Sequence, residues 1–295
     1  MKKARVLFWI LPLVMLLSCS SDDENEVIVI DVPAAEVTPE PSVMNVNING
    51  EALSTWSRAY KSEGFFIFQF GYGQITVHES GRFGYYTMRI LDGQPSFQKT
   101  YSSFANFSSN YFEFHIVSHN DVTKRFKGYF SGYVYRNGDI TAESKFVNGT
   151  IDMAYEDLIP SITGLGNSAK INGAEWLQTN YNSTRGTGPA YGNVTRNGYS
   201  DDGYKIAIHY QPNNSPVGTY NFNSTDATNK VTLSKFNPST LTYTDYVCTG
   251  TLNINLKVES IFGGTYQFTA VNPNDPSDVI QVTDGNFKFV WVYFE

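Results

Sequence analysis

The sequence has 295 residues, and its side chains give a formal net charge of −7 at pH 7. An acidic chain lacks the basic face that nucleic acid requires, so we expect no nucleic-acid partner. Aromatic residues make up 15% of the chain, and charged residues only 17%. Tyr, Phe, Thr and Val favour strands, and Asn and Gly favour tight turns, so the composition predicts an all-β protein.

Residues 1–18 have the pattern of a signal peptide. Basic residues lie close to the N-terminus, and residues 6–17 form an apolar run. A run of this length matches the central region of a signal peptide and is too short to span a bilayer. It ends at Leu16-Leu17-Ser18-Cys19, which resembles the lipobox of bacterial lipoproteins. In that family the peptide is cut before the cysteine, and the cysteine is acylated.

This resemblance implies that Cys19 is the lipidated first residue of the mature chain and attaches it to the membrane. The acidic run over residues 20–26 is similar to the export signal of surface lipoproteins in the Bacteroidetes. We therefore expect a chain that is lipid-anchored in the outer membrane and faces the cell exterior. The alternatives are an ordinary secretory signal with a chance cysteine, and a solvated linker in place of the export signal.

Residues 19–44 are expected to form a disordered tether between this anchor and the folded part. They contain Asp, Glu, Pro and Ala with few aromatic residues. Such a segment has too little apolar surface to fold by itself.

The sequence has two cysteines, Cys19 and Cys248. If Cys19 is acylated, Cys248 has no partner for an intrachain disulfide. Cys248 follows a strand-like run over residues 241–247, so we expect a packed thiol rather than a reactive one.

Short landmarks recur in the same order in the two halves of the remaining chain. The pairs are Ile48-Asn49-Gly50 with Ile171-Asn172-Gly173, Tyr72-Gly73-Gln74-Ile75-Thr76 with Tyr191-Gly192-Asn193-Val194-Thr195, Tyr86-Thr87-Met88-Arg89-Ile90 with Tyr204-Lys205-Ile206-Ala207-Ile208, Phe126-Lys127-Gly128-Tyr129-Phe130 with Phe262-Gly263-Gly264-Thr265-Tyr266, and Asn148-Gly149 with Asp284-Gly285. They predict a duplicated domain, with copies at residues 45–158 and 168–295 and a linker at 159–167. The second copy is longer in its middle, which predicts an added hairpin or loop within residues 213–230. The repeat is similar to tandem domains of unknown function in surface lipoproteins of the Bacteroidetes, a family that supplies no catalytic residues.

Apolar residues recur with a period of two in both copies, and no helical period follows the signal peptide. Asn137-Gly138, Asn148-Gly149 and Asp284-Gly285 are predicted to be two-residue hairpin turns, since a type I′ turn needs positive φ at both central positions. Short strands with frequent turns predict two tandem antiparallel β domains. Each is expected to be a sandwich or a flattened, lipocalin-like barrel.

No catalytic motif stands out in the sequence, so we expect neither an enzyme nor a cofactor. A hydrolase is the less favoured hypothesis. His115 and His119 lie four apart, which puts them roughly 13 Å from each other on a straight strand, too far to share a metal ion. The stretch over residues 272–278 is rich in oxygen-bearing side chains and is a weaker candidate for calcium than for an ordinary hairpin turn.

Tyr129, Tyr133 and Tyr135 are the candidate ligand-binding residues. In the predicted repeat, Phe130 and Val134 align with Tyr266 and Ala270 and should face the core, which turns the three tyrosines outward. A tyrosine ring with its hydroxyl is suited to stacking on sugar rings or to anchoring an interface. The alternatives are aromatic pairs that only stabilise the sheet, or packing of the second domain on this face.

These observations favour a lipid-anchored cell-surface protein for binding or adhesion, with a glycan as the candidate ligand. The membrane contact is expected through acylated Cys19 alone. The alternative function is that of a structural or accessory subunit in an outer-membrane protein assembly, with a protein partner in place of the glycan.

Overall fold

The computed structural model describes residues 40–53, 56–91, 98–186, 192–223, 227–258 and 260–290. These residues form β-strands and connections, with one short 3-10 turn, η1 (Ser108–Asn110), so the prediction of an all-β fold is confirmed. None of their helical segments is long and apolar enough to span a bilayer. The predictions for the signal peptide, for Cys19 and for most of the tether lie outside the described residues.

The first half of the folded chain forms one strongly bent sheet, sheet A. Its order is β11-β3-β4-β5-β6-β7-β9-β10-β1-β2, and β8 also pairs with β9. All neighbours are antiparallel except β11 and β3. The strands are β1 (Val43–Ile48), β2 (Glu51–Leu53), β3 (Ser57–Ser62), β4 (Phe65–Phe70), β5 (Gly73–His78), β6 (Phe83–Leu91), β7 (Gln98–Ser102), β8 (Phe112–Asn120), β9 (Arg125–Arg136), β10 (Ser144–Ala154) and β11 (Glu156–Asp157). Because β1 begins at Val43, the sheet includes the last two residues of the stretch assigned to the tether.

The second half of the folded chain forms two antiparallel sheets, with orders β13-β12-β22-β21-β20-β17 in sheet B and β14-β15-β16-β18-β19 in sheet C. The strands are β12 (Gly166–Ile171), β13 (Ala174–Leu177), β14 (Asn180–Arg185), β15 (Val194–Tyr199), β16 (Tyr204–Tyr210), β17 (Gly218–Phe222), β18 (Lys230–Asn237), β19 (Thr242–Asp245), β20 (Val247–Val258), β21 (Ile261–Asn272) and β22 (Asp275–Val290). Strand β17 lies within residues 213–230, where the sequence predicts an added hairpin or loop. It pairs with β20 at the edge of sheet B rather than within that segment. We call strands β1–β11 the N-terminal half and β12–β22 the C-terminal half.

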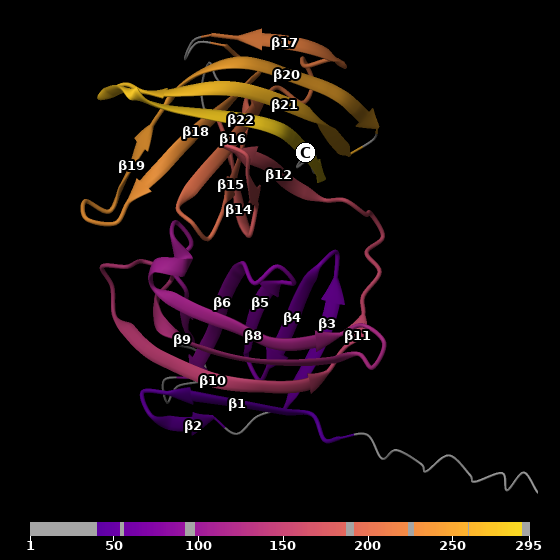
Figure 1. Cartoon of the computed structure of the whole chain (residues 1–295), viewed down its shortest axis with the longest axis vertical. Helices are drawn as coiled ribbons and strands as arrows, with labels where there is room; N and C mark the ends of the chain where they lie inside the picture. The colour runs from indigo at the N-terminus through magenta and orange to yellow at the C-terminus, as the bar shows by residue number, and fades with distance from the viewer. Residues whose placement is uncertain are drawn as a thin grey trace, which may run out of the picture. The chain divides into compact units, whose positions relative to one another are not determined.

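Each half encloses its own apolar core between two layers, and no sheet closes into a barrel. In the N-terminal half, β3–β6 run across β8–β10 (Figure 1), and aromatic rings from both layers meet between them. Phe83 of β6 stacks on Phe112 of β8 with ring centroids 4.4 Å apart. In the C-terminal half, Tyr210 of sheet C stacks on Phe262 of sheet B at 4.2 Å. The period of two in the sequence produces these cores, because alternate side chains of a strand point to the same face.

A third, smaller cluster joins the two halves. Phe104 and Tyr135 of the N-terminal half are buried together with Phe236 of the C-terminal half, and the rings of Phe104 and Phe236 are 5.2 Å apart. Residues 41–295 accordingly belong to one compact unit.

The two Ile-Asn-Gly landmarks form equivalent turns. Asn49 and Gly50 have φ values of 50° and 88° between β1 and β2, and Asn172 and Gly173 have 49° and 83° between β12 and β13. Positive φ at both central residues is the type I′ hairpin geometry that Asn-Gly favours. In both halves the first strand of this hairpin pairs with a long strand near the end of the half, β1 with β10 and β12 with β22.

The predicted hairpin turns at Asn148-Gly149 and Asp284-Gly285 are wrong, because both dipeptides lie inside long strands, β10 and β22. Each glycine lies opposite an aromatic residue of the neighbouring strand, Gly149 opposite Phe130 and Gly285 opposite Tyr266. A Cβ added at Gly149 would lie 2.2 Å from the Asn45 backbone oxygen and 2.6 Å from the Phe130 ring, and one at Gly285 would lie 2.3 Å from the Tyr266 ring. The glycines are therefore needed for close packing against the neighbouring strands and their rings rather than for a turn.

The Asn137-Gly138 prediction is correct in part. Both residues have positive φ, 55° and 73°, and they directly follow β9. Because β10 begins only at Ser144, they open a longer connection instead of forming a two-residue hairpin.

Candidate ligand-binding surfaces

The outward side of β9 carries the predicted tyrosines. Phe130 and Val134 are buried in the core, and Tyr129 and Tyr133 point the other way with 47% and 50% of their surface exposed. Residues four apart on a strand are separated by about 13 Å, so the two rings lie at different points of one sheet face. The structure thus confirms the predicted orientation of this pair.

Each exposed tyrosine is held by a second ring from a neighbouring strand. His115 of β8 stacks on Tyr129 with centroids 4.7 Å apart and an interplanar angle of 23°. Phe146 of β10 meets Tyr133 edge-on at 5.4 Å and 64°. We call these four residues the aromatic face. Side-chain pairs across neighbouring strands restrict the rotamers of both partners, so the rings are held in place before any ligand arrives.

Polar side chains lie between the two ring pairs. Ser131 of β9 is directly opposite Asn148 of β10, and Asn148 is directly opposite Asn47 of β1. The Asn47 amide donates a hydrogen bond of 3.0 Å to the Asn148 side-chain oxygen. This leaves a row of hydroxyl and amide groups that is flanked by rings on the outward face of the sheet. We call these three residues the polar row.

Tyr135 requires a correction, because it does not belong to the exposed surface. It is on the outward side of β9, as predicted, but only 9% of its surface is exposed. It is buried in the small cluster with Phe104 and Phe236, and the Tyr111 ring meets it edge-on at 6.4 Å. Burial raises the pKa of its hydroxyl. The C-terminal half therefore covers this end of β9, as one of the alternatives anticipated, and leaves Tyr129 and Tyr133 free.

His115 and His119 lie on opposite faces of their sheet as well as far apart along β8. A β-bulge lies between Ile116 and Ser118, so His115 is opposite Tyr129 whereas His119 is opposite the core residue Phe126. The His119 ring accordingly lies 5.3 Å from the core ring of Phe66. The extra residue of the bulge turns the two histidines to opposite faces, and they do not form one site.

Asn272 ends β21, Pro273 and Asn274 form the turn, and Asp275 begins β22, so residues 272–278 comprise a tight hairpin turn and its flanking strand residues. Asn272 and Tyr246 both donate to the Asp278 carboxylate, at 3.0 and 2.6 Å, and Ser277 donates to Asp275 at 2.6 Å. Within the part of the chain that the structure describes, no group of three or more His, Cys, Asp or Glu side chains is placed to hold a metal ion.

Cys248 is a packed thiol, as predicted. It is buried and unpaired, and its sulfur accepts a hydrogen bond of 3.3 Å from the Leu233 backbone N–H. Burial raises the pKa of the thiol to about 11, so the nucleophilic thiolate is rare at neutral pH.

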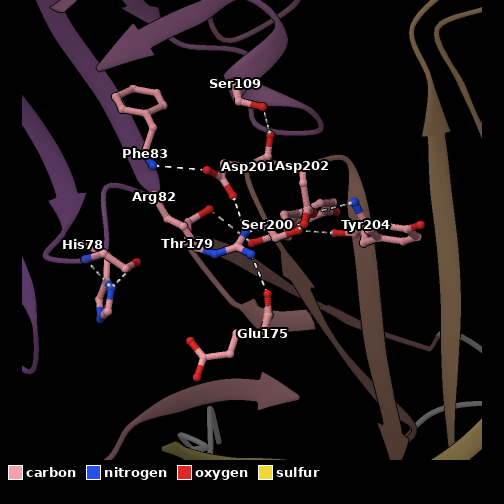
Figure 2. Close-up of polar contacts among 12 residues, drawn as sticks. His78, Arg82, Phe83, Ser109, Glu175, Thr179, Ser200, Asp201, Asp202 and Tyr204 are labelled. Atoms are coloured by element: carbon pink, nitrogen blue, oxygen red, sulfur yellow. Dashed lines mark hydrogen bonds and ion pairs between the residues drawn. The ribbon is translucent and has the colours of Figure 1, made fainter. Parts of the chain in front are cut away.

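Polar side chains also join the two halves, in a contact that the sequence does not predict. Figure 2 shows the Arg82 side chain reaching from the N-terminal half to Asp201 and to the backbone carbonyl of Glu175. Its guanidinium lies 2.8 Å from the Asp201 carboxylate and 3.4 Å from that of Asp202. The backbone N–H of Phe83 also donates to the Asp201 carboxylate. The Ser109 hydroxyl donates to the backbone carbonyl of Asp201. The Asp-Asp-Gly sequence at 201–203 forms a turn between β15 and β16, and nothing near it in the sequence indicates a partner more than a hundred residues away.

Burial raises the pKa of Asp201, and the nearby Arg82 charge only partly opposes that rise. Replacing Arg82 alone should therefore destabilise the protein, because it leaves the largely buried Asp201 carboxylate without its counter-charge. We interpret this junction as a contact that joins the two halves, since Arg82 bonds Asp201 and the Glu175 carbonyl across them.

No protein-family model, curated protein or solved structure matches this chain.

Proposed function

We propose that this protein is a lipid-anchored cell-surface binding protein that takes a glycan on its aromatic face. The observation that carries the proposal is the pair of half-exposed rings, Tyr129 and Tyr133, beside the polar row of Ser131, Asn148 and Asn47. The lipobox resemblance at Cys19 supports the anchor and the location in the outer membrane.

The chemistry of this face suits a sugar. A pyranose ring has an apolar C–H face that stacks on an aromatic ring and hydroxyls that both donate and accept hydrogen bonds. Tyr129 and Tyr133 provide such rings, and the serine hydroxyl and asparagine amides supply donors and acceptors. With rings about 13 Å apart, the face matches an extended oligosaccharide better than a single sugar.

The rigidity of the face favours binding. Tyrosine has few rotatable bonds, so it contributes contact area at a low cost in conformational entropy. The long ladder between β9 and β10 and the ring contacts of His115 and Phe146 hold the tyrosines further. Little ordering then remains to be done when the ligand binds.

The alternative, an accessory subunit in an outer-membrane assembly, predicts a different surface. The centre of a permanent protein interface is mostly apolar and poor in unpaired polar groups. Here hydroxyls and amides lie between the rings, and this mixture favours a hydroxylated ligand.

A glycan array probed with the full chain tests the proposal. We expect discrete oligosaccharide hits that disappear when Tyr129→Ser and Tyr133→Ser are combined. A stacked ring contributes on the order of 1 kcal/mol, so the loss of two weakens binding roughly thirtyfold. Tyr72→Ser is the matched control, because Tyr72 is also exposed but lies away from β9. A blank array, or hits that the double variant retains, would overturn the proposal.

A further inference from the structure

A cleft of about 510 Å³ lies between the two halves. The N-terminal half contributes Phe65, Ile67 and Tyr85, and the C-terminal half contributes Leu177 and Tyr181. Its volume falls within the range of small-molecule sites, which combine apolar walls with a few polar groups. None of its lining residues belongs to the aromatic face.

Two polar side chains in this cleft come from directly opposite positions of a strand pair. The backbone N–H of Gln178 donates to the carbonyl of Asn167 at 2.9 Å, continuing the ladder between β12 and β13. Side chains at such opposite positions lie on the same face of a sheet as close neighbours. Asn167 is 3% exposed.

The orientation of the Asn167 amide is set by a third residue. The Tyr266 hydroxyl donates to the Asn167 side-chain oxygen at 2.6 Å. The oxygen of the amide is therefore occupied, and its nitrogen is the group that still needs a partner.

Both side chains leave a buried polar atom unpaired. The Asn167 amide nitrogen and the Gln178 side-chain oxygen have no hydrogen-bond partner among the described residues, although both atoms are buried. Buried polar atoms without partners are uncommon in folded proteins because they have lost their water without replacement. Here one is a donor and its neighbour is an acceptor, which is the combination that a hydroxyl satisfies from both sides.

The cleft is nearly free of charge. Glu63 is the one ionisable carboxylate among its lining residues, and that carboxylate accepts the backbone N–H of Gly164. The other polar groups are amides and hydroxyls, such as those of Gln74, Thr76 and Thr179. No cationic side chain of the described residues lines the cleft, and the Arg196 guanidinium that stacks on Tyr181 donates to the Ser183 hydroxyl, so the lining favours a neutral ligand.

We propose that the cleft is a second binding site, for a small neutral sugar. Sugar hydroxyls accept a hydrogen bond from the Asn167 amide and donate one to the Gln178 oxygen, while the apolar face of the sugar packs on Tyr85 and Tyr181. This site does not rest on the aromatic face, because none of its described lining residues belongs to β8, β9 or β10.

Isothermal titration of the full chain, in a detergent without a sugar headgroup, tests this site. The probes are the methyl glycosides of glucose, galactose, mannose and N-acetylglucosamine. We expect at least one to bind, and Gln178→Met to weaken that binding at least tenfold. The same variant should unfold at the same temperature as the parent or a higher one, since it replaces an unpaired buried acceptor with an apolar group of similar shape.

Two further variants locate the effect. Tyr181→Ala should weaken binding several-fold without loss of fold, because the ring is largely exposed. The combined Tyr129→Ser and Tyr133→Ser variant should bind these probes as the parent does. If no probe binds, or if Gln178→Met binds as tightly as the parent, the cleft is not a sugar site. Array hits that depend on Tyr129 and Tyr133 would then still support the aromatic face on its own.

Discussion

Strands β9 and β21 have matching places in the two halves but present different side chains outward. Phe130 of β9 and Tyr266 of β21 are both buried, and each lies opposite a glycine of the next strand. The outward residues of β21 are Thr265, Gln267 and Thr269, where β9 has Tyr129, Ser131 and Tyr133. The inward residues of the two strands are thus under the same packing constraint, whereas the outward residues are not.

This difference separates what the fold requires from what it does not. Strand β21 shows that short polar side chains suffice on the outward face of such a strand. The two large exposed rings on β9 are therefore not demanded by the architecture. That is the main reason for assigning the aromatic face, and not its counterpart in the C-terminal half, to ligand binding.

Substitution of the glycine opposite the buried ring is expected to have the largest effect on stability in both halves. Gly149→Ala and Gly285→Ala should each destabilise the protein by about 3 kcal/mol, because the new methyl group overlaps the ring opposite and the strand must shift. Urea unfolding of both variants measures this, with Thr265→Ala on the exposed face of β21 as a control near zero. If only one of the two variants lost stability, β9 and β21 would not be under the same packing constraint.

The C-terminal half contains a partly buried, acid-sensitive histidine. His209 lies between Thr195 and Thr232, with ring nitrogens 3.0 Å from each hydroxyl, and burial lowers its pKa to about 4. A pKa lowered on folding means that stability is full above about pH 6.5 and falls as the pH drops toward 4, because the unfolded chain takes up the proton first.

We expect protonation of His209 to lower the free energy of unfolding by about 2 kcal/mol between pH 6.5 and 4, after allowance for partial exposure. Unfolding curves of the parent and of His209→Gln, recorded across this pH range, give the difference. Identical pH profiles for the two proteins would show that His209 is not held neutral by the fold.

The junction between the halves has a smaller expected effect. Arg82→Met should cost about 1–2 kcal/mol, because it leaves the Asp201 carboxylate without its cation in a largely buried place. Adding Asp201→Asn to that variant should recover part of the loss, since no charge is then stranded. Denaturant unfolding of the single and double variants checks both steps, and a double variant less stable than Arg82→Met would contradict this account of the pair.

Local patterns in the sequence were enough to predict the strands and the outward direction of Tyr129 and Tyr133. Side-chain alternation is a property of the strand itself, so a short stretch such as residues 126–134 contains it. The turns at Asn49-Gly50 and Asn172-Gly173 are local in the same sense, because the required φ values belong to the two residues themselves.

The errors involve partners that are distant in the sequence. Asn148-Gly149 has the composition of a turn, and the Phe130 ring and the Asn45 backbone beside it explain why a glycine lies in this strand. The burial of Tyr135 depends on Phe236 of the other half, and the two histidines are separated by a bulge at Val117. The Arg82–Asp201 pair exists only once the halves have met. The unpaired atoms of Asn167 and Gln178 likewise depend on Tyr266, about a hundred residues away, which occupies the Asn167 side-chain oxygen.

The central claim is that the rings of the aromatic face serve binding rather than stability. The most direct test is Tyr129→Thr combined with Tyr133→Thr, which gives β9 threonines like those of β21. We predict a stability loss of only about 1 kcal/mol, from two cross-strand ring pairs, and a roughly thirtyfold loss of affinity for the glycan identified on the array. Titration calorimetry and urea unfolding of this variant measure the two quantities. A variant that binds the glycan unchanged but is several kcal/mol less stable would show that the rings only hold the sheet together.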